Sequence, residues 1–229
     1  MSTFLQLVNK VEENSGTIDT RSNPTVDVTA PATLRQQKIV NWVADAWSLI
    51  QNARTDWRFM RGEFEHALVT GQQRYTAAQL GLSDLATWVG PLSNQPDPMA
   101  CFDPAIGGAD QQRVRFLQWD AWRERYARGA IASSRPIHWS IDFDNKLCIG
   151  PAPDRAWTLC GEYIRTPQVL SANADVPRLP AQFHDVIVYR ALMLLADHDE
   201  APSALIPAQG KYADTYHRLV NATTEPVTF

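Results

Sequence analysis

The sequence has few of the features that mark secreted or membrane proteins. It contains three cysteines, Cys101, Cys148 and Cys160, whose odd number and spacing fit neither a disulfide framework nor a Cys-x-x-Cys zinc knuckle. No stretch approaches the roughly 20 apolar residues of a transmembrane helix. The opening MSTFLQLVNKVEENSG lacks the basic and apolar segments of a signal peptide. We therefore expect reduced thiols, no membrane association and synthesis in a cytoplasm.

A strong charge of one sign is also lacking. The 21 Lys and Arg residues stand against 25 Asp and Glu residues, which gives a formal net charge of −4. Proteins that wrap nucleic acid tightly need clustered cations to neutralise the phosphates. The composition therefore argues against non-specific DNA binding over the whole surface, but it is compatible with a wall that DNA slides past.

The common catalytic signatures are absent as well. The sequence contains no Gly-x-Ser-x-Gly, no Gly-x-x-x-x-Gly-Lys-Ser/Thr, no Gly-x-Gly-x-x-Gly and no His-Glu-x-x-His motif. Asp142 and Asp144 flank Phe143 and precede Asn145, a pattern that is more typical of turn chemistry than of acid–base catalysis. The sequence favours a protein that is not an enzyme, and a hydrolase using these two aspartates stays open as an alternative.

Candidate metal ligands form no consistent set. A zinc site at Cys148 and Cys160 would need two more ligands, and strand alternation points His138 away from Ile137 and Trp139. The segment ADHDE at residues 196–200 is denser, but consecutive helical residues point in different directions. His184 and His198 are separated by roughly 21 Å of helical rise, too far to act together. We predict no metal and no cofactor.

Helical periodicity is present at both ends of the chain. A short helix is predicted from Phe4, and Thr33-Leu34-Arg35-Gln36 has the form of a capping box. That box opens a longer helix whose apolar positions continue to Trp57. Near the C-terminus, VIVYRALMLLA predicts a central buried helix. A last helix is predicted to carry on one face Leu205, Ala208, Tyr212, Tyr216 and Leu219.

Strand periodicity dominates the middle of the chain. FEHALVTGQQRYT predicts a hairpin, and RVRF predicts a further strand. Strict alternation from Ile137 to Phe143, a turn at Asp144-Asn145 and two later runs, Lys146 to Ile149 and Trp157 to Tyr163, predict a three-stranded meander. Both Cys148 and Cys160 would then be small apolar residues of this scaffold.

Together these elements predict an α+β fold, a helical bundle with an inserted β-rich region that contains an antiparallel meander. The predicted boundaries divide the chain into four parts. They are residues 1–60 (the N-terminal part of the bundle), 61–170 (the β-rich insertion with one short helix), 171–222 (the C-terminal part of the bundle) and 223–229 (an extended tail).

One block, RVRFLQWDAWRERYARG, combines basic and aromatic residues. Its arginines are Arg113, Arg115, Arg123, Arg125 and Arg128. Such a block can meet phosphates and stack on bases, which leaves a nucleic-acid-binding module as an alternative. The helical spacing of Trp119, Trp122 and Tyr126 favours another interpretation, in which the aromatic residues face a core and the arginines form the solvated side of the helix.

Taken in order, five segments of the chain resemble the head-to-tail connector adaptors of tailed bacteriophages, particularly the adaptor proteins of short-tailed phages. The segments are IVNWVADAWSLIQNARTDWRFM, FEHALVTGQQRYTAAQLGL, RFLQWDAWRERYARG, IHWSIDFDNKLCIGPAPDRAWTLCGEYIRTPQVL and LPAQFHDVIVYRALMLLADHDEAPSALIPAQGKYADTYHRLV. A proline-turned pair of strands, then Tyr-x-x-x-Pro and Leu-Pro before a buried helix, is similar to the family in order and spacing.

The resemblance implies a structural part of the virion neck, between capsid and tail. It implies a ring of about twelve copies beneath the portal, with DNA passing through the channel without specific binding. A C-terminal extension would dock on the portal, and another face would meet the tail tube or nozzle protein. The extension here would comprise Thr223, Thr224, Glu225, Pro226, Val227, Thr228 and Phe229. The five arginines would then contact channel DNA or a neighbouring subunit, and a virion-associated hydrolase remains the enzymatic alternative.

Overall fold

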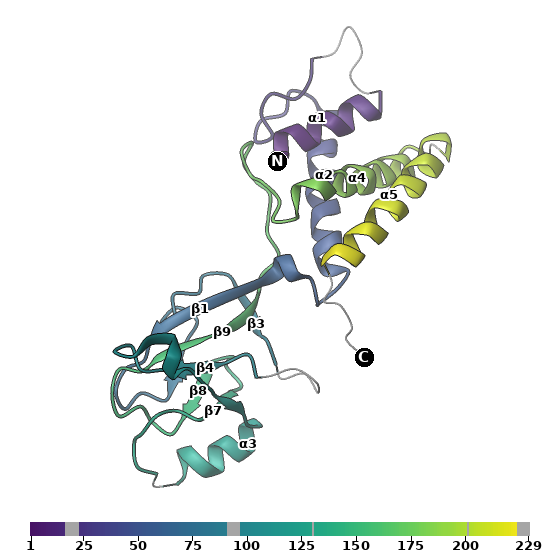
Figure 1. The fold of residues 1–229 in the computed structure, drawn as a ribbon. Helices are drawn as coiled ribbons and strands as arrows, with labels where there is room; N and C mark the ends of the chain where they lie inside the picture. Colours follow the sequence, from purple (N-terminus) through teal and green to yellow (C-terminus); the bar gives the residue numbers. More distant parts are fainter. Residues whose placement is uncertain (17–22, 91–96, 130, 201, 224–229) are drawn as a thin grey trace. The chain divides into compact units, whose positions relative to one another are not determined.

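The computed structural model in Figure 1 describes residues 1–16, 23–90, 97–129, 131–200 and 202–223. The chain forms two compact units, one of Met1–Met60 with Pro167–Phe229 and one of Arg61–Thr166. The first unit is helical, and the strands of the described residues belong to the second. The α+β fold class is therefore confirmed, while the four predicted domain boundaries stay a prediction.

Four helices build the first unit. They are α1 (Phe4–Asn14), α2 (Leu34–Asn52), α4 (Asp185–His198) and α5 (Pro202–Thr223). The short 3₁₀ segments η1 (Arg58–Met60) and η4 (Ala181–Phe183) adjoin them. Helix α4 contacts α1, α2 and α5, as its largely apolar sequence requires, and Val186 and Ile187 are completely buried. None of the described helices is both long and apolar enough to cross a membrane.

The predicted capping box opens α2. The Gln36 amide donates to Thr33 Oγ1 over 3.2 Å, and the Thr33 amide donates to Gln36 Oε1 over 3.1 Å. The helix ends at Asn52, so the prediction that it continues to Trp57 is wrong. Trp57 is nevertheless completely buried, because its indole folds back and donates to the Ile50 carbonyl over 3.0 Å. Its place in the apolar periodicity therefore reflected burial rather than helical structure.

The second unit contains two sheets. Sheet A has the order β1-β9-β4-β5, and β3 also pairs with β9. Its strands are β1 (Arg61–Ala67), β3 (Leu85–Trp88), β4 (Ala100–Phe102), β5 (Gln112–Arg113) and β9 (Thr158–Arg165). Sheet B has the order β2-β8-β7-β6, and its β6–β7 pair is parallel. Its strands are β2 (Arg74–Tyr75), β6 (Arg115–Phe116), β7 (His138–Ile141) and β8 (Leu147–Gly150).

Two predicted strand pairings are wrong. The predicted hairpin around Gly71 does not form, since β1 pairs with β9 and β2 pairs with β8. The third strand of the predicted meander, β9, also leaves β8 and lies between β1 and β4. Only the β7–β8 hairpin stands, with Asn145 at a φ of 59° in its turn. Both errors have one cause: the two turns carry the chain from one sheet to the other, which local alternation does not reveal.

Two clusters of buried side chains define the layers of the second unit. Sheets A and B enclose a core that includes Phe64, Trp88, Met99, Trp139, Ile149, Leu159 and Tyr163. Helix α3 (Trp119–Trp122) and the π-helical turn η3 (Arg123–Ala127) cover the other face of sheet B, where Trp122 and Tyr126 cluster with Cys148. The 3₁₀ segment η2 (Gly107–Asp110) precedes β5. The order is therefore sheet A, core, sheet B, helix.

The three cysteines are free and lie in different strands. Cys148 belongs to sheet B and Cys160 to sheet A, so their predicted placement on neighbouring strands is wrong. Burial raises the pKa of Cys101 to about 11 and that of Cys148 to about 12. Cys160 is half-buried, and burial raises its pKa as well. No group of three or more metal-ligating side chains occurs within the described residues.

The buried aromatic layer generates a stability prediction. Trp122→Ala should lower the free energy of unfolding by about 3–5 kcal/mol, because truncating a completely buried Trp leaves a cavity between α3 and sheet B. The matched control is Ile106→Ala, since Ile106 of the same unit is 63% exposed and its truncation should change the free energy of unfolding by under about 0.5 kcal/mol. Urea unfolding followed by tryptophan fluorescence measures both. Equal effects of the two substitutions would contradict the layer assignment.

The cysteine environments generate a prediction about reactivity. At about pH 8, iodoacetamide should modify Cys160 of the folded protein first, because the thiolate is the nucleophile and the other two thiols are buried with raised pKa values. Timed alkylation followed by peptide mass spectrometry gives the three rates. In urea the rates should become similar. Native Cys148 that reacts as fast as Cys160 would argue against the described burial.

Candidate functional site

The aromatic residues of the predicted basic and aromatic block hold the helix to sheet B. Trp119 and Trp122 stack with ring centroids 5.5 Å apart, and the Tyr126 hydroxyl lies 2.6 Å from His138 Nδ1. Gly150 on β8 permits this packing, since a Cβ there would lie 2.5 Å from the Tyr126 ring. The aromatic residues therefore belong to the interior of the unit, which leaves the arginines as the part of the block available to partners.

The five predicted arginines do not form one patch. Arg113 lies on β5 of sheet A, while Arg115 lies on β6 of sheet B and pairs in register with His138. Arg123 forms an ion pair with Asp120 at 3.1 Å, and Arg128 forms one with Glu124 at 2.5 Å. Because these pairs connect neighbours on the same helical segment, they neutralise much of its positive charge.

Arg115 and Arg125 are brought together around His138. Burial lowers the pKa of His138, and the charges of Arg125 and Arg115 lower it further. Both arginines are exposed, and no ion pair joins either to an acidic side chain of the described residues. The Arg125 guanidinium also lies 5.6 Å from the centre of the Tyr126 ring. Of the five predicted arginines, Arg115 and Arg125 are therefore left uncompensated on the helix side of sheet B, while Arg113 lies apart on sheet A.

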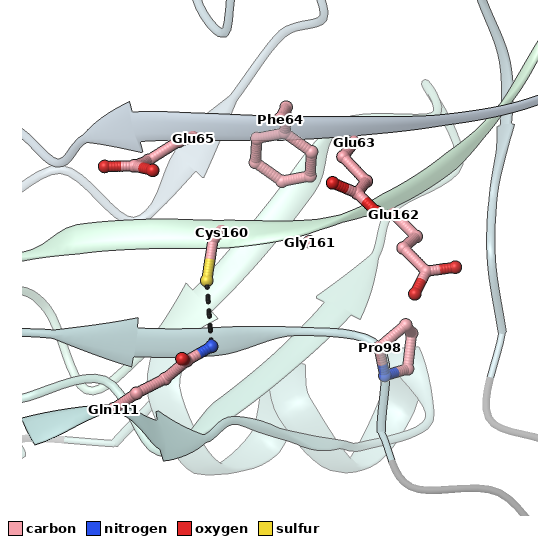
Figure 2. A pocket seen from close by; sticks show the side chains of 8 residues that line it. All are labelled: Glu63, Phe64, Glu65, Pro98, Gln111, Cys160, Gly161 and Glu162. Carbon is pink, nitrogen blue, oxygen red and sulfur yellow. Dashed lines mark hydrogen bonds between the residues drawn. The ribbon is translucent and has the colours of Figure 1, made fainter. Parts of the chain in front are cut away.

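A groove of about 410 Å³ lies on the outer face of sheet A, as Figure 2 shows. It is lined by Glu63, Phe64, Glu65, Pro98, Gln111, Cys160, Gly161 and Glu162. In the β1–β9 register, Glu63 stands opposite Glu162 and Glu65 stands opposite Cys160. The Gln111 amide donates to Cys160 Sγ over 3.4 Å. Three carboxylates therefore surround one groove.

Sequence reasoning missed this groove. The alternation of Glu63 and Glu65 with Phe64 is visible in the sequence and predicts two acidic side chains on one face of a strand. The contribution of Glu162 is not visible, because nothing local indicates that β9 pairs with β1 across almost a hundred residues of chain.

The candidate catalytic aspartates close the β7–β8 turn. Asp142 Oδ1 accepts hydrogen bonds from the Asp144 amide (3.0 Å) and the Lys146 amide (2.9 Å), and the Asp144 carboxylate forms an ion pair with Lys146 Nζ at 2.8 Å. The hydrogen bond and charge of Lys146 lower the pKa of Asp144. These contacts are those of turn chemistry, as the sequence pattern indicated.

The histidines and acids of α4 have structural partners. Buried His184 accepts the Ser2 amide at Nδ1 over 3.1 Å, and its Nε2 lies 2.9 Å from the Leu179 carbonyl oxygen. At the other end of the helix, Asp199 holds Arg35 of α2 through two contacts of 2.9 and 2.5 Å. His198 lies 2.9 Å from Asp199. The predicted ligand-rich segment 196–200 thus connects α4 to α2.

The predicted portal-binding tail is described only at its first residue. Thr223 ends α5, and its hydroxyl donates to the Leu219 carbonyl over 2.6 Å. Residues 224–229, which carry the remaining six predicted contacts, lie outside the described residues.

The comparison with known proteins agrees with the order of segments along the chain. The sequence matches the family described as SU10 adaptor protein over residues 2–228, a range that runs through both units. No curated protein matches the chain. The resemblance inferred from the sequence is therefore confirmed. The chain belongs to the SU10 adaptor protein family and is a phage adaptor protein, a structural component of the virion that interacts with other phage structural proteins.

Proposed function

We propose that this adaptor is the head-to-tail connector of its phage. About twelve copies close into a ring beneath the portal at the capsid vertex, and DNA passes through the centre of the ring. The protein is made in the host cytoplasm and takes its place in the neck of the virion. The observation that carries this proposal is the family match over residues 2–228.

Exposed apolar side chains support contacts with other proteins. Phe143 at the tip of the β7–β8 hairpin is 87% exposed and meets Trp119 edge-on, with ring centroids 5.9 Å apart. Leu34 at the start of α2 is 86% exposed. Exposed aromatic and aliphatic groups of this kind are typical of surfaces that a partner covers.

The charge distribution supports passage of DNA without retention. The net charge is −4, and Arg123 and Arg128 are each paired with an acidic neighbour. Phosphate binding requires uncompensated cations, and every neutralised arginine removes one potential phosphate contact. A channel wall with a net negative charge repels the phosphates of the duplex more strongly than it attracts them.

We assign portal binding to residues 223–229 and binding of the tail tube or nozzle protein to another face of the ring. The tail follows α5 directly, and α5 packs against the central helix α4. Because residues 223–229 are continuous with α5, docking them on the portal would attach the helical unit to it. The insertion 61–170 then supplies contacts to neighbouring copies or tail proteins.

Deleting residues 224–229 tests the portal assignment. The truncated protein should keep its helical circular dichroism and melting temperature but lose at least about tenfold in affinity for isolated portal rings, because the deleted residues would supply the contacts with the portal. Native mass spectrometry of the mixture measures binding. The control replaces the same six residues by Gly and Ser at equal length. Full binding by both variants would exclude the tail as the docking segment.

DNA binding is tested by titration with duplex DNA. At roughly 0.15 M salt we expect no measurable retention, because the net charge is −4 and Arg123 and Arg128 are already paired with acidic neighbours. Salt-dependent binding that disappears in Arg123→Ala/Arg125→Ala/Arg128→Ala would instead favour a nucleic-acid-binding module. Fluorescence anisotropy over a range of salt concentrations distinguishes the two functions.

A further inference from the structure

The acidic groove and the exposed arginine pair lie on opposite sides of the second unit. On β9, Leu159 and Tyr163 enter the core between the sheets, so Cys160 and Glu162 point away from it toward the groove. On β7, Trp139 enters the same core, so His138 points toward the helix layer together with Arg115, its partner in register. Two sheets and the core separate the two charged surfaces.

The groove carries more negative charge than its own unit compensates. Glu63 stands directly opposite Glu162, and like charges in that position destabilise a strand pair. Arg61 reaches Glu162 at 3.4 Å, whereas no ion pair reaches Glu63 or Glu65 from the described residues. Arg113 and Glu65 are separated by three strand spacings, about 14 Å between their backbones, and no ion pair joins them among the described residues. Figure 2 shows the three carboxylates around the open groove.

The helix side of sheet B carries the complementary charge. The acids of the helical segment, Asp120 and Glu124, are already paired with Arg123 and Arg128. Arg115 and Arg125 therefore remain positive, exposed and close enough to His138 to act on it together. A guanidinium matches a carboxylate in charge and in planar hydrogen-bonding geometry.

We propose that the groove of one copy receives Arg115 and Arg125 of a second copy of this chain. Because the two surfaces lie on opposite faces, one copy cannot satisfy both by itself, and the contact between copies is heterologous. Heterologous contacts generate rings when the rotation closes. The inference rests on the proposed ring-forming function and names the surfaces that would form it.

The charged contact sets the orientation of neighbouring copies. Exposed ion pairs are individually weak and are screened by salt, so the surfaces contribute mainly to the rate and direction of association. Repetition around a ring multiplies the effect. The apolar contacts of other surfaces supply the remaining affinity.

Reciprocal charge reversal tests the contact. The groove variant is Glu63→Arg/Glu65→Arg, and the arginine variant is Arg115→Glu/Arg125→Glu. Each variant alone places like charges together, and self-association should weaken by about tenfold or more. An equimolar mixture should recover assembly, because each variant then meets an opposite charge on both of its faces. Native mass spectrometry of the full-length chain, alone and with portal rings at low salt, gives the species.

Controls separate folding from association. Glu13→Arg/Asp45→Arg makes the same change in net charge on exposed positions of α1 and α2 and should assemble like the unmodified protein. Circular dichroism establishes whether each variant folds. If the groove variant does not fold, Glu63→Gln/Glu65→Gln replaces it, because glutamine has the same size as glutamate. This variant should weaken assembly less than the charge reversal does.

The outcomes distinguish the two proposals. Unmodified protein that never associates with itself or with a portal ring overturns the ring-forming function. If the unmodified protein assembles and each charge-reversed variant alone assembles equally well, the groove contact is wrong but the ring-forming function stands. If the folded variants do not assemble alone and do not assemble when mixed, the pairing of the groove with Arg115 and Arg125 is wrong. That result would indicate that another partner occupies the groove.

Discussion

The second unit depends on the burial of sheet B on both of its faces. Every residue of β8, Leu147–Gly150, is buried, because its alternate side chains enter the core between the sheets or the aromatic cluster beneath α3. Trp139 is completely buried on one side, and Tyr126 packs on Gly150 from the other. With both faces of sheet B covered, the charged residues are left on the outer face of sheet A and on the solvated side of the helix.

This layering gives a structural adaptor two different charged faces. The acids that the sequence offers for chemistry serve turns and helix contacts: Asp142 orders a hairpin turn and Asp199 holds Arg35. Glu63 and Glu65, which no ion pair of the described residues reaches, line a groove on sheet A. A protein that works by fitting against other proteins benefits from charge held on strands, since strand pairing limits the motion of the backbone that carries it.

Helical elements were predictable because their signals are local. The capping box at Thr33 and Gln36 and the apolar run of α4 are each contained within a few turns of chain, and both predictions agree with the structure. Trp57 shows the limit of such reasoning, since a buried aromatic residue beyond the helix continues the same periodicity. Strands β7 and β8 were predictable for a similar reason, because a short turn at Asn145 joins them.

The sequence by itself determined the fold class, the helices, one hairpin and the resemblance to phage adaptors. Only the tertiary structure decided that β1 pairs with β9, that Arg113 lies on another sheet from Arg115, and that Glu63 faces Glu162. The physical reason is that strand alternation specifies which side chains share a face but not which distant strand lies beside them. Charged surfaces assembled across sheets therefore emerge only when the chain has folded.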